Sequence, residues 1–127
     1  MEVILDTNAL SAYADGVPSA IAAVHAASGL ALPVIVIGEY RFGIAGSRHF
    51  REYLKWLEGL LGVCRVLDVT EETARWYAQV RAELRRAGKP VPSNDLWIAA
   101  LARQHTLVIL SRDAHFDPVS GLRRVGW

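Results

Sequence analysis

The chain has 127 residues, of which 52% are hydrophobic and 21% charged, and its net charge is +1. This size suits one domain, residues 1–127, and the composition excludes a disordered protein. The longest apolar stretch, residues 26–38, is well short of the ~20 residues that span a membrane, and no leader peptide is recognised, so we expect a cytoplasmic protein. The single cysteine, Cys64, excludes an internal disulfide and a cysteine-rich zinc site.

The first third of the chain begins with an apolar run, residues 3–5, which predicts a short buried strand. Capping residues follow and predict one helix, and Pro18 opens a second helix that ends near Gly29. A brief strand is expected at Leu32. Residues 34–45 are predicted to form a helix, because the apolar positions then recur at steps of three and four.

The middle of the chain alternates between helix and strand. Ser47 is expected to cap a helix with an apolar stripe that includes Leu57. Residues 63–69 are predicted to form a strand. A long helix begins after Thr70, with acidic residues in its first turn, and ends just before Gly88.

The last third carries one more helix and two short strands. Ser93 or Asn94 is expected to cap the helix that holds Asp95. Strands are predicted at residues 107–110 and 122–125. Short buried strands separated by helices are typical of a parallel-sheet α/β sandwich, in which ligands bind outside the carboxyl ends of the strands.

Four acidic residues far apart in the sequence occupy positions that this fold would bring together: Asp6, Glu39, Asp95 and Asp113. Asp6 and Asp113 follow apolar strands, Glu39 lies in an otherwise apolar helix, and Asp95 lies near a helix start. Clustered carboxylates repel one another unless a cation neutralises them. Their grouping therefore indicates a site for a hard divalent ion, Mg²⁺ or Mn²⁺.

Each of these acids also has a simpler structural explanation. Asp6 can cap the first helix, Asp95 is stabilised by a helix dipole, and Asp113 can be an ordinary loop residue. Glu39 has the weakest alternative, because its apolar neighbours leave it little polar surface. The four histidines show no paired ligand spacing.

The motifs around these acids resemble a known family. The segments LDTN (5–8), EYRFG (39–43), NDLWIAA (94–100) and LSRD (110–113), followed by HFD (115–117), are similar to the PIN domain. More narrowly, they resemble the VapC-type ribonuclease toxins of type II toxin–antitoxin pairs. The resemblance covers essentially the whole chain, with the motifs in the family's order.

The resemblance implies a PIN-like three-layer α/β/α sandwich with a short, mostly parallel central sheet. It also implies a metal-dependent endoribonuclease that uses Mg²⁺ or Mn²⁺ and acts on RNA, including structured RNA such as tRNA. The implied catalytic and metal-binding residues are Asp6, Glu39, Asp95 and Asp113. The implied supporting residues are Thr7, Asn8, Ser111 and Asp117. Asn94 stands where some members carry a second carboxylate, so the number of ions stays open.

Partners follow from the same resemblance: a cognate antitoxin, an RNA substrate and a second copy of the chain in a homodimer. Arg41 and Arg112 are candidates for contacting the RNA backbone. Candidates for the antitoxin groove are Tyr13, Tyr40, Phe42 and Tyr53.

Other classes remain to be weighed against the nuclease. A receiver domain needs adjacent acids after its first strand, but Thr7 follows Asp6. An aspartyl-phosphate phosphatase needs a second aspartate where this chain has Asn8. The alternative that remains is a catalytically inactive PIN-like module that binds a protein partner.

Overall fold

The chain folds around a five-stranded sheet in which all neighbouring strands are parallel. The computed structural model describes all residues, 1–127. The strands are β1 (Glu2–Leu5), β2 (Gly29–Pro33), β3 (Arg65–Leu67), β4 (Val108–Leu110) and β5 (Arg124–Val125), in the order β3-β2-β1-β4-β5. From β1, in the centre of the sheet, the chain continues to β2 and β3 on one side of β1. It then crosses to β4 and β5 on the other side. The carboxyl ends of β1 and β4 therefore form a topological switch point, where ligands bind in such folds.

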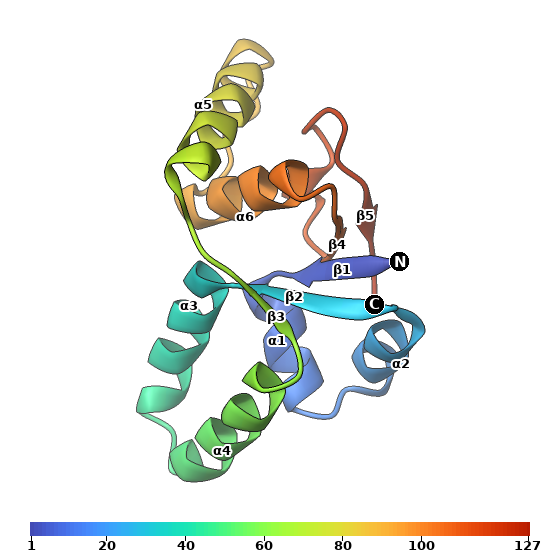
Figure 1. Cartoon of the computed structure of the whole chain (residues 1–127), viewed down its shortest axis with the longest axis vertical. Coiled ribbons are helices and arrows are strands. Elements are labelled where there is room, and N and C mark those ends of the chain that lie inside the picture. The colour runs from blue at the N-terminus through green and yellow to red at the C-terminus, as the bar shows by residue number, and fades with distance from the viewer.

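Helices cover both faces of this sheet (Figure 1). The helices are α1 (Thr7–Ala14), α2 (Pro18–Ala26), α3 (Val34–Ala45), α4 (Phe50–Leu61), α5 (Glu71–Arg86) and α6 (Ser93–Gln104), with a short 3-10 helix η1 (Ala114–Phe116). In Figure 1, α1–α4 lie below the sheet, and α5 and α6 lie above it. This arrangement confirms the predicted α/β/α sandwich. None of the helices is both long and apolar enough to cross a bilayer.

The two central strands carry the core. Ile4, Leu5, Ile109 and Leu110 are at most 1% exposed. Because helices cover both faces of the sheet, these strands are apolar throughout instead of alternating with polar residues. Burying such side chains contributes roughly 1.5–3 kcal/mol each before the entropy of folding is subtracted.

Most predicted elements are confirmed, although strand ends differ by one or two residues. The predicted helix 34–45 matches α3 (Val34–Ala45), and Thr70 caps α5 with a capping box. Gly88, just beyond α5, has φ +66°, a left-handed conformation that favours glycine. The predicted strand 63–69 is shorter and covers only Arg65–Leu67.

Two capping predictions are wrong. The helix α4 begins at Phe50, because the Ser47 hydroxyl accepts a hydrogen bond from the His49 N–H at 3.0 Å and so closes a tight turn before the helix. The helix α6 begins at Ser93, with Pro92 at the N-cap and no side-chain cap. This earlier start places Asp95 at the third helical position, still within the first turn.

A partly buried ion pair connects α5 to α6 and to the loop before β5. Arg103 donates to both carboxylate oxygens of Glu83, at 2.5 and 3.2 Å, and also donates to Ser120. The Ser120 hydroxyl donates to Glu83 at 2.5 Å. The hydrogen bonds from Arg103 and Ser120 lower the pKa of Glu83 from its usual 4.5 to about 2.

We expect Glu83→Gln to lower the free energy of unfolding by about 1–2 kcal/mol at pH 7, because it removes a charge-assisted pair. The stabilisation by a depressed acid pKa is present above pH 4.5 and is lost as the pH falls toward 2. The difference between wild type and variant should therefore close in that window, as measured by urea unfolding. The exposed and unpaired Glu58, changed to Gln, is the matched control. A constant difference from pH 7 to pH 2 would contradict the assignment.

Candidate active site

The four predicted acids converge at the carboxyl edge of the sheet. Asp6 follows β1 directly, and Asp113 lies three residues after β4. Glu39 extends from α3 and Asp95 from the first turn of α6, on opposite layers of the sandwich. The charges of Asp113 and Glu39 both act on Asp6, and all three act on Asp95. The structure thus brings together residues separated by more than one hundred positions.

Asp6 is the most deeply placed of these acids, with 5% of its surface exposed. One carboxylate oxygen accepts a hydrogen bond from the Ala9 N–H at 2.8 Å, so that Asp6 caps α1. The other accepts a hydrogen bond from the Ser111 hydroxyl. Burial nevertheless raises the pKa of Asp6, and the neighbouring carboxylates Asp113 and Glu39 add to the rise. The capping role and the site role therefore coexist in one side chain.

Asp95, in the first turn of α6, is partly buried. Burial raises its pKa, and repulsion from Asp113 and Asp6 raises it further. These effects outweigh the helix dipole, which favours the ionised form at this position. The site therefore holds negative charge at a cost that a bound cation would offset.

Hydrogen bonds position the remaining acids. The Thr7 hydroxyl donates to Glu39 at 2.9 Å, and so links the start of α1 to α3. The Ser111 oxygen accepts a hydrogen bond from the Asp113 N–H at 2.9 Å while the Ser111 hydroxyl donates to Asp6. Ser111 is fully buried. It therefore connects the acids that follow β1 and β4.

His115 is a member of the cluster that the sequence did not reveal. Its Nδ1 atom lies 3.0 Å from an oxygen of Asp113 and 3.7 Å from an oxygen of Asp95. One potential ligand atom from each of these three residues lies within 4.8 Å of the others. A search for paired histidines could not find it, because its partners are carboxylates. The available signal was its position two residues after Asp113, in the turn that η1 forms.

Other predicted site residues lie outside this cluster or are held elsewhere. Asn8 and Asn94 are both exposed. Because residue 94 is an asparagine, α6 contributes one carboxylate, that of Asp95, to the site. Both oxygens of Asp117 accept hydrogen bonds from Arg124, at 2.7 and 2.9 Å, which lowers the pKa of Asp117. Asp117 thus pairs with β5 instead of joining the other acids.

The two predicted RNA-binding arginines differ in their surroundings. Arg41 is exposed on α3. The guanidinium of Arg112 lies 3.7 Å from the centre of the Trp127 ring and donates to the Trp127 carbonyl at 2.6 Å. Arg112 therefore holds Trp127 close to the segment that contains Asp113.

The donor set fits a hard divalent cation. Carboxylate oxygens of Asp95 and Asp113 lie within 4.8 Å of each other and of the His115 ring, and burial and repulsion between carboxylates raise the pKa of Asp6 and Asp95. Oxygen ligands of this kind suit Mg²⁺ and Mn²⁺, and the adjacent imidazole suits Mn²⁺ better than Mg²⁺. The cluster can therefore hold an ion and, with it, activate water or bind a phosphate.

Comparisons with known proteins identify a family model and several relatives of this chain. The family model of the PIN domain matches residues 3–122. Ribonuclease VapC5 of Mycobacterium tuberculosis is 32% identical over 76% of this chain and 73% of its own length. The tRNA(fMet)-specific endonuclease VapC of Shigella flexneri is 34% identical over 73% of this chain and 71% of its own.

Solved structures extend the likeness to the whole fold. The crystal structure of DNA-bound VapBC from Salmonella typhimurium superimposes with a TM-score of 0.85 at 26% identity, and the match covers 100% of this chain and 98% of the other. The crystal structure of VapBC-5 from Mycobacterium tuberculosis, a member of the VapBC family of toxin–antitoxin systems, superimposes with a TM-score of 0.77 at 25% identity. The match covers 99% of this chain and 98% of the other.

We expect Mn²⁺ to raise the melting temperature of the wild type. A ligand present at about 100 times its Kd adds about 2.7 kcal/mol to the free energy of unfolding. Asp95→Asn should lose this gain. Without divalent ions at pH 8, the variant should melt above the wild type, because a raised acid pKa means that ionisation destabilises the folded state. That advantage should shrink as the pH falls and Asp95 becomes protonated.

Differential scanning calorimetry at pH 8 and pH 5, with EDTA or Mn²⁺, measures both effects. Asp68→Asn is the control, since Asp68 is exposed and lies outside the cluster. An equal response to Mn²⁺ in Asp95→Asn would show that the ion binds elsewhere.

Proposed function

We propose that this chain, which belongs to the PIN domain family and to the VapC ribonucleases within it, is the toxin of a toxin–antitoxin pair. It hydrolyses RNA phosphodiester bonds at the acidic cluster. The observation that carries this proposal is the acidic cluster at the carboxyl edge of the sheet. Asp95, Asp113 and His115 offer ligand atoms within 4.8 Å of one another, and Ser111 links Asp6 to Asp113. Glu39 acts electrostatically on Asp6 and Asp95. Its named relatives are ribonucleases and endonucleases.

Asp6, Asp95 and Asp113 are the proposed ligands of Mg²⁺ or Mn²⁺, and Glu39 either ligates an ion or orients the attacking water. His115 is an additional candidate ligand, supported by its 3.0 Å distance from Asp113. When bound, the cation lowers the pKa of water and neutralises charge on the phosphate and the leaving oxygen.

The chain's own polar residues hold these acids in place. The hydrogen bond that Ser111 donates leaves only part of the Asp6 carboxylate available and fixes its orientation. The hydrogen bond from Thr7 does the same for Glu39. No lysine lies in the cluster, so the His115 imidazole or an ionised carboxylate would accept the proton of an attacking water.

The proposed substrate is RNA, and tRNA is a candidate because one relative is a tRNA(fMet)-specific endonuclease. Arg41 is exposed and free to contact a phosphate. Arg112 can contact RNA only if it leaves Trp127 or binds through the open side of its guanidinium. RNA hydrolysis and control by an antitoxin also place the proposed site of action in the cytoplasm.

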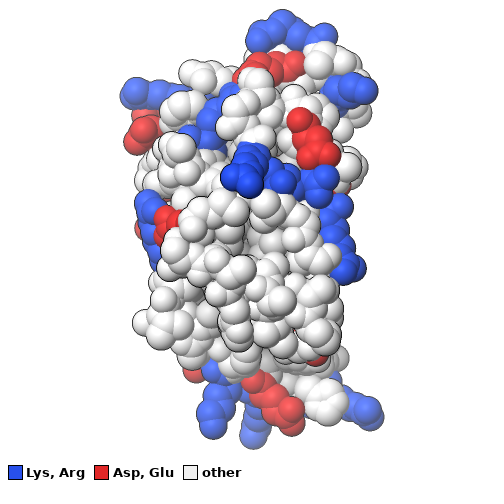
Figure 2. All heavy atoms as spheres, turned by 90° about the vertical axis from the view of Figure 1, so that its right-hand side faces the viewer, with Lys and Arg blue, Asp and Glu red and all other residues white.

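An antitoxin partner is proposed because the solved relatives include VapBC complexes. Residues 16–38, which include α2, carry no Lys, Arg, Asp or Glu. Figure 2, which shows the right-hand side of Figure 1, has a broad uncharged area across its middle, with mostly basic groups above it and charged groups of both signs below it. A groove of about 610 Å³ between α1 and α4 is lined by Tyr13 and Trp56, while Tyr40 and Tyr53 line a separate cavity with Glu39. The uncharged surface that includes α2 suits a protein partner, and the groove beside α4 adds the charged residues Glu52 and Lys55.

Phe42 lies outside both cavities and is 86% exposed on α3, where Val34 is also exposed. An exposed aromatic side chain on an apolar helix supports the proposed homodimer. The alternative function, an inactive PIN-like binding module, would use these same surfaces without cleaving RNA. Cleavage therefore separates the two functions.

We expect purified protein, freed of antitoxin, to cleave RNA with Mn²⁺ or Mg²⁺ and to be inactive in EDTA. Asp6→Asn and Asp113→Asn should lower the rate at least about 100-fold, since each removes a charged ligand. Ser111→Ala should lower it about 10–100-fold, as changes to groups that orient ligands do. Gel analysis of tRNA and total RNA measures the rates.

Asp68→Asn is the matched control and should cleave like the wild type. A wild type that is folded and binds Mn²⁺ yet leaves all RNA intact would favour the binding module. Retained cleavage in Asp6→Asn would remove the site assignment while leaving the enzyme class.

A second expectation concerns toxicity. Expression of the wild type alone should arrest growth within a few generations, and co-expression of its antitoxin should relieve the arrest. The Asp6→Asn variant should be harmless at equal protein level, because the arrest requires cleavage. Growth curves with quantified protein levels test this, and a toxic Asp6→Asn variant would contradict it.

A further inference from the structure

A cavity of about 480 Å³ lies between the last turns of α5, the link that follows and the first turn of α6. Its centre is apolar, with Leu84, Leu96, Pro90 and Val91 among the lining residues. Leu84 and Leu96 are nearly fully buried where α5 packs on α6, and they form the floor of the cavity. We call this cavity the α5–α6 pocket.

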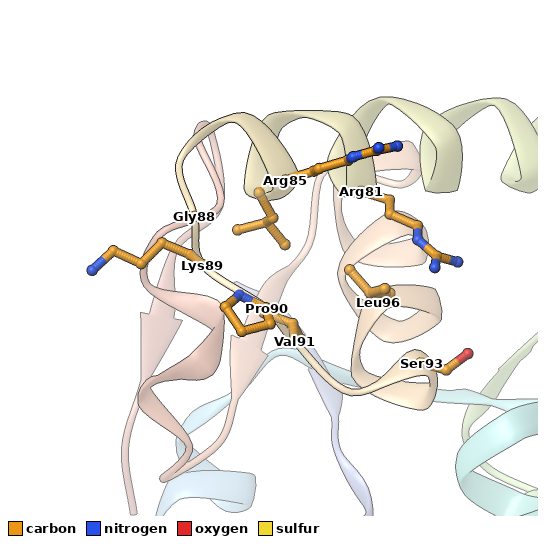
Figure 3. Close-up of a pocket in the computed structure, with 9 residues that line it drawn as sticks. Arg81, Arg85, Gly88, Lys89, Pro90, Val91, Ser93 and Leu96 are labelled. Atoms are coloured by element: carbon orange, nitrogen blue, oxygen red, sulfur yellow. The ribbon is translucent and has the colours of Figure 1, made fainter.

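Three basic side chains surround the floor: Arg81, Arg85 and Lys89. In Figure 3, Arg81 and Arg85 extend from α5 on one side, Lys89 extends to the other, and Leu96 and Pro90 lie between them. None of the three forms a salt bridge, whereas Arg75, Arg103 and Arg124 each pair with a carboxylate. Arg81 donates only to the Tyr77 hydroxyl, at 2.7 Å.

The composition of the α5–α6 pocket indicates the chemistry of its ligand. Cations without carboxylate partners around an apolar floor suit an anion that carries a flat or apolar body. A nucleotide has this character, because its phosphate is anionic and its base has an apolar face. Arginine guanidinium groups bind phosphate oxygens and also pack on bases.

The first turn of α6 connects the pocket to the acidic cluster. Ser93 lines the pocket and is the first residue of α6, and Asp95 belongs to the cluster two residues later. Along the helix axis these two residues are about 3 Å apart, but they point to different sides of the helix. An RNA strand whose scissile phosphate lies at Asp95 would therefore reach the α5–α6 pocket by passing around the first turn of α6.

The negative charge of the acidic cluster means that nearby cations would favour RNA binding. The clustered carboxylates repel every phosphate of an approaching RNA, and a bound cation compensates only locally. Unpaired cations beside the cluster attract the flanking phosphates and hold the strand in register.

We propose that the α5–α6 pocket binds a nucleotide of single-stranded RNA that flanks the scissile phosphate, with the base on the apolar floor and the phosphate at Arg81 and Arg85. This assignment rests on the proposed nuclease function and adds a substrate subsite to it. An acidic peptide of a protein partner is the competing ligand.

The test compares Arg81→Gln/Arg85→Gln with Arg48→Gln/Arg51→Gln, a matched double variant. Arg48 and Arg51 are exposed and form no salt bridge, and they lie near and on α4, away from the pocket. Cleavage of a short RNA with Mn²⁺ gives kcat and KM, and fluorescence anisotropy gives Kd and its dependence on salt. Melting temperatures establish that both variants fold.

We expect the pocket variant to raise KM and Kd at least about tenfold while kcat changes less than about twofold. The slope of log Kd against log salt should fall by about 0.7, because the variant loses its contact with one phosphate of the single strand. Both parameters should stay within about twofold of the wild type in the control. When the RNA is shortened from one end until the flanking nucleotide is missing, the pocket variant and the wild type should have the same KM and Kd.

Equal effects in the two variants, or none in either, would overturn the pocket assignment and leave the nuclease function intact. Weaker antitoxin binding with unchanged KM would assign the pocket to an acidic peptide. A wild type that neither binds nor cleaves RNA would overturn the proposed function together with the pocket.

Discussion

The mutual repulsion of carboxylates at one edge of the sheet is the constraint on which the rest of this structure depends. The register of β1 and β4, with Leu5 opposite Leu110, places Asp6 beside Ser111 at the point where both strands end. Ser111 then connects Asp6 to Asp113 by two hydrogen bonds. The buried apolar strands cannot shift to separate these charges, so the fold keeps a region of negative charge that a divalent cation would neutralise.

The two helical layers complete the site from opposite sides. Glu39 comes from α3 below the sheet, and Asp95 comes from α6 above it (Figure 1). The position of α6 depends in turn on α5, to which the pair of Glu83 and Arg103 ties it. Features far from the acids therefore determine how closely the acids approach. Loosening either layer would weaken the proposed ion site without altering any ligand.

Charge is distributed unevenly around this site, and the distribution accounts for several proposed properties. The acids suit an ion and its phosphate, while the unpaired cations of the α5–α6 pocket suit the adjoining RNA. The uncharged surface that includes α2 suits a protein partner instead. A net charge of +1 conceals this division, because the two signs nearly cancel over the whole chain.

The sequence by itself determined the order of helices and strands, the parallel sheet and the four acids, because apolar runs, caps and motifs are local patterns. It misplaced the starts of α4 and α6, where Ser47 closes a turn and Pro92 precedes the helix. Only the tertiary structure brought His115 to Asp113 and Asp95, paired Asp117 with Arg124 and held Arg112 on Trp127. These outcomes depend on side chains that meet through folding, and spacing along the chain alone does not determine such contacts.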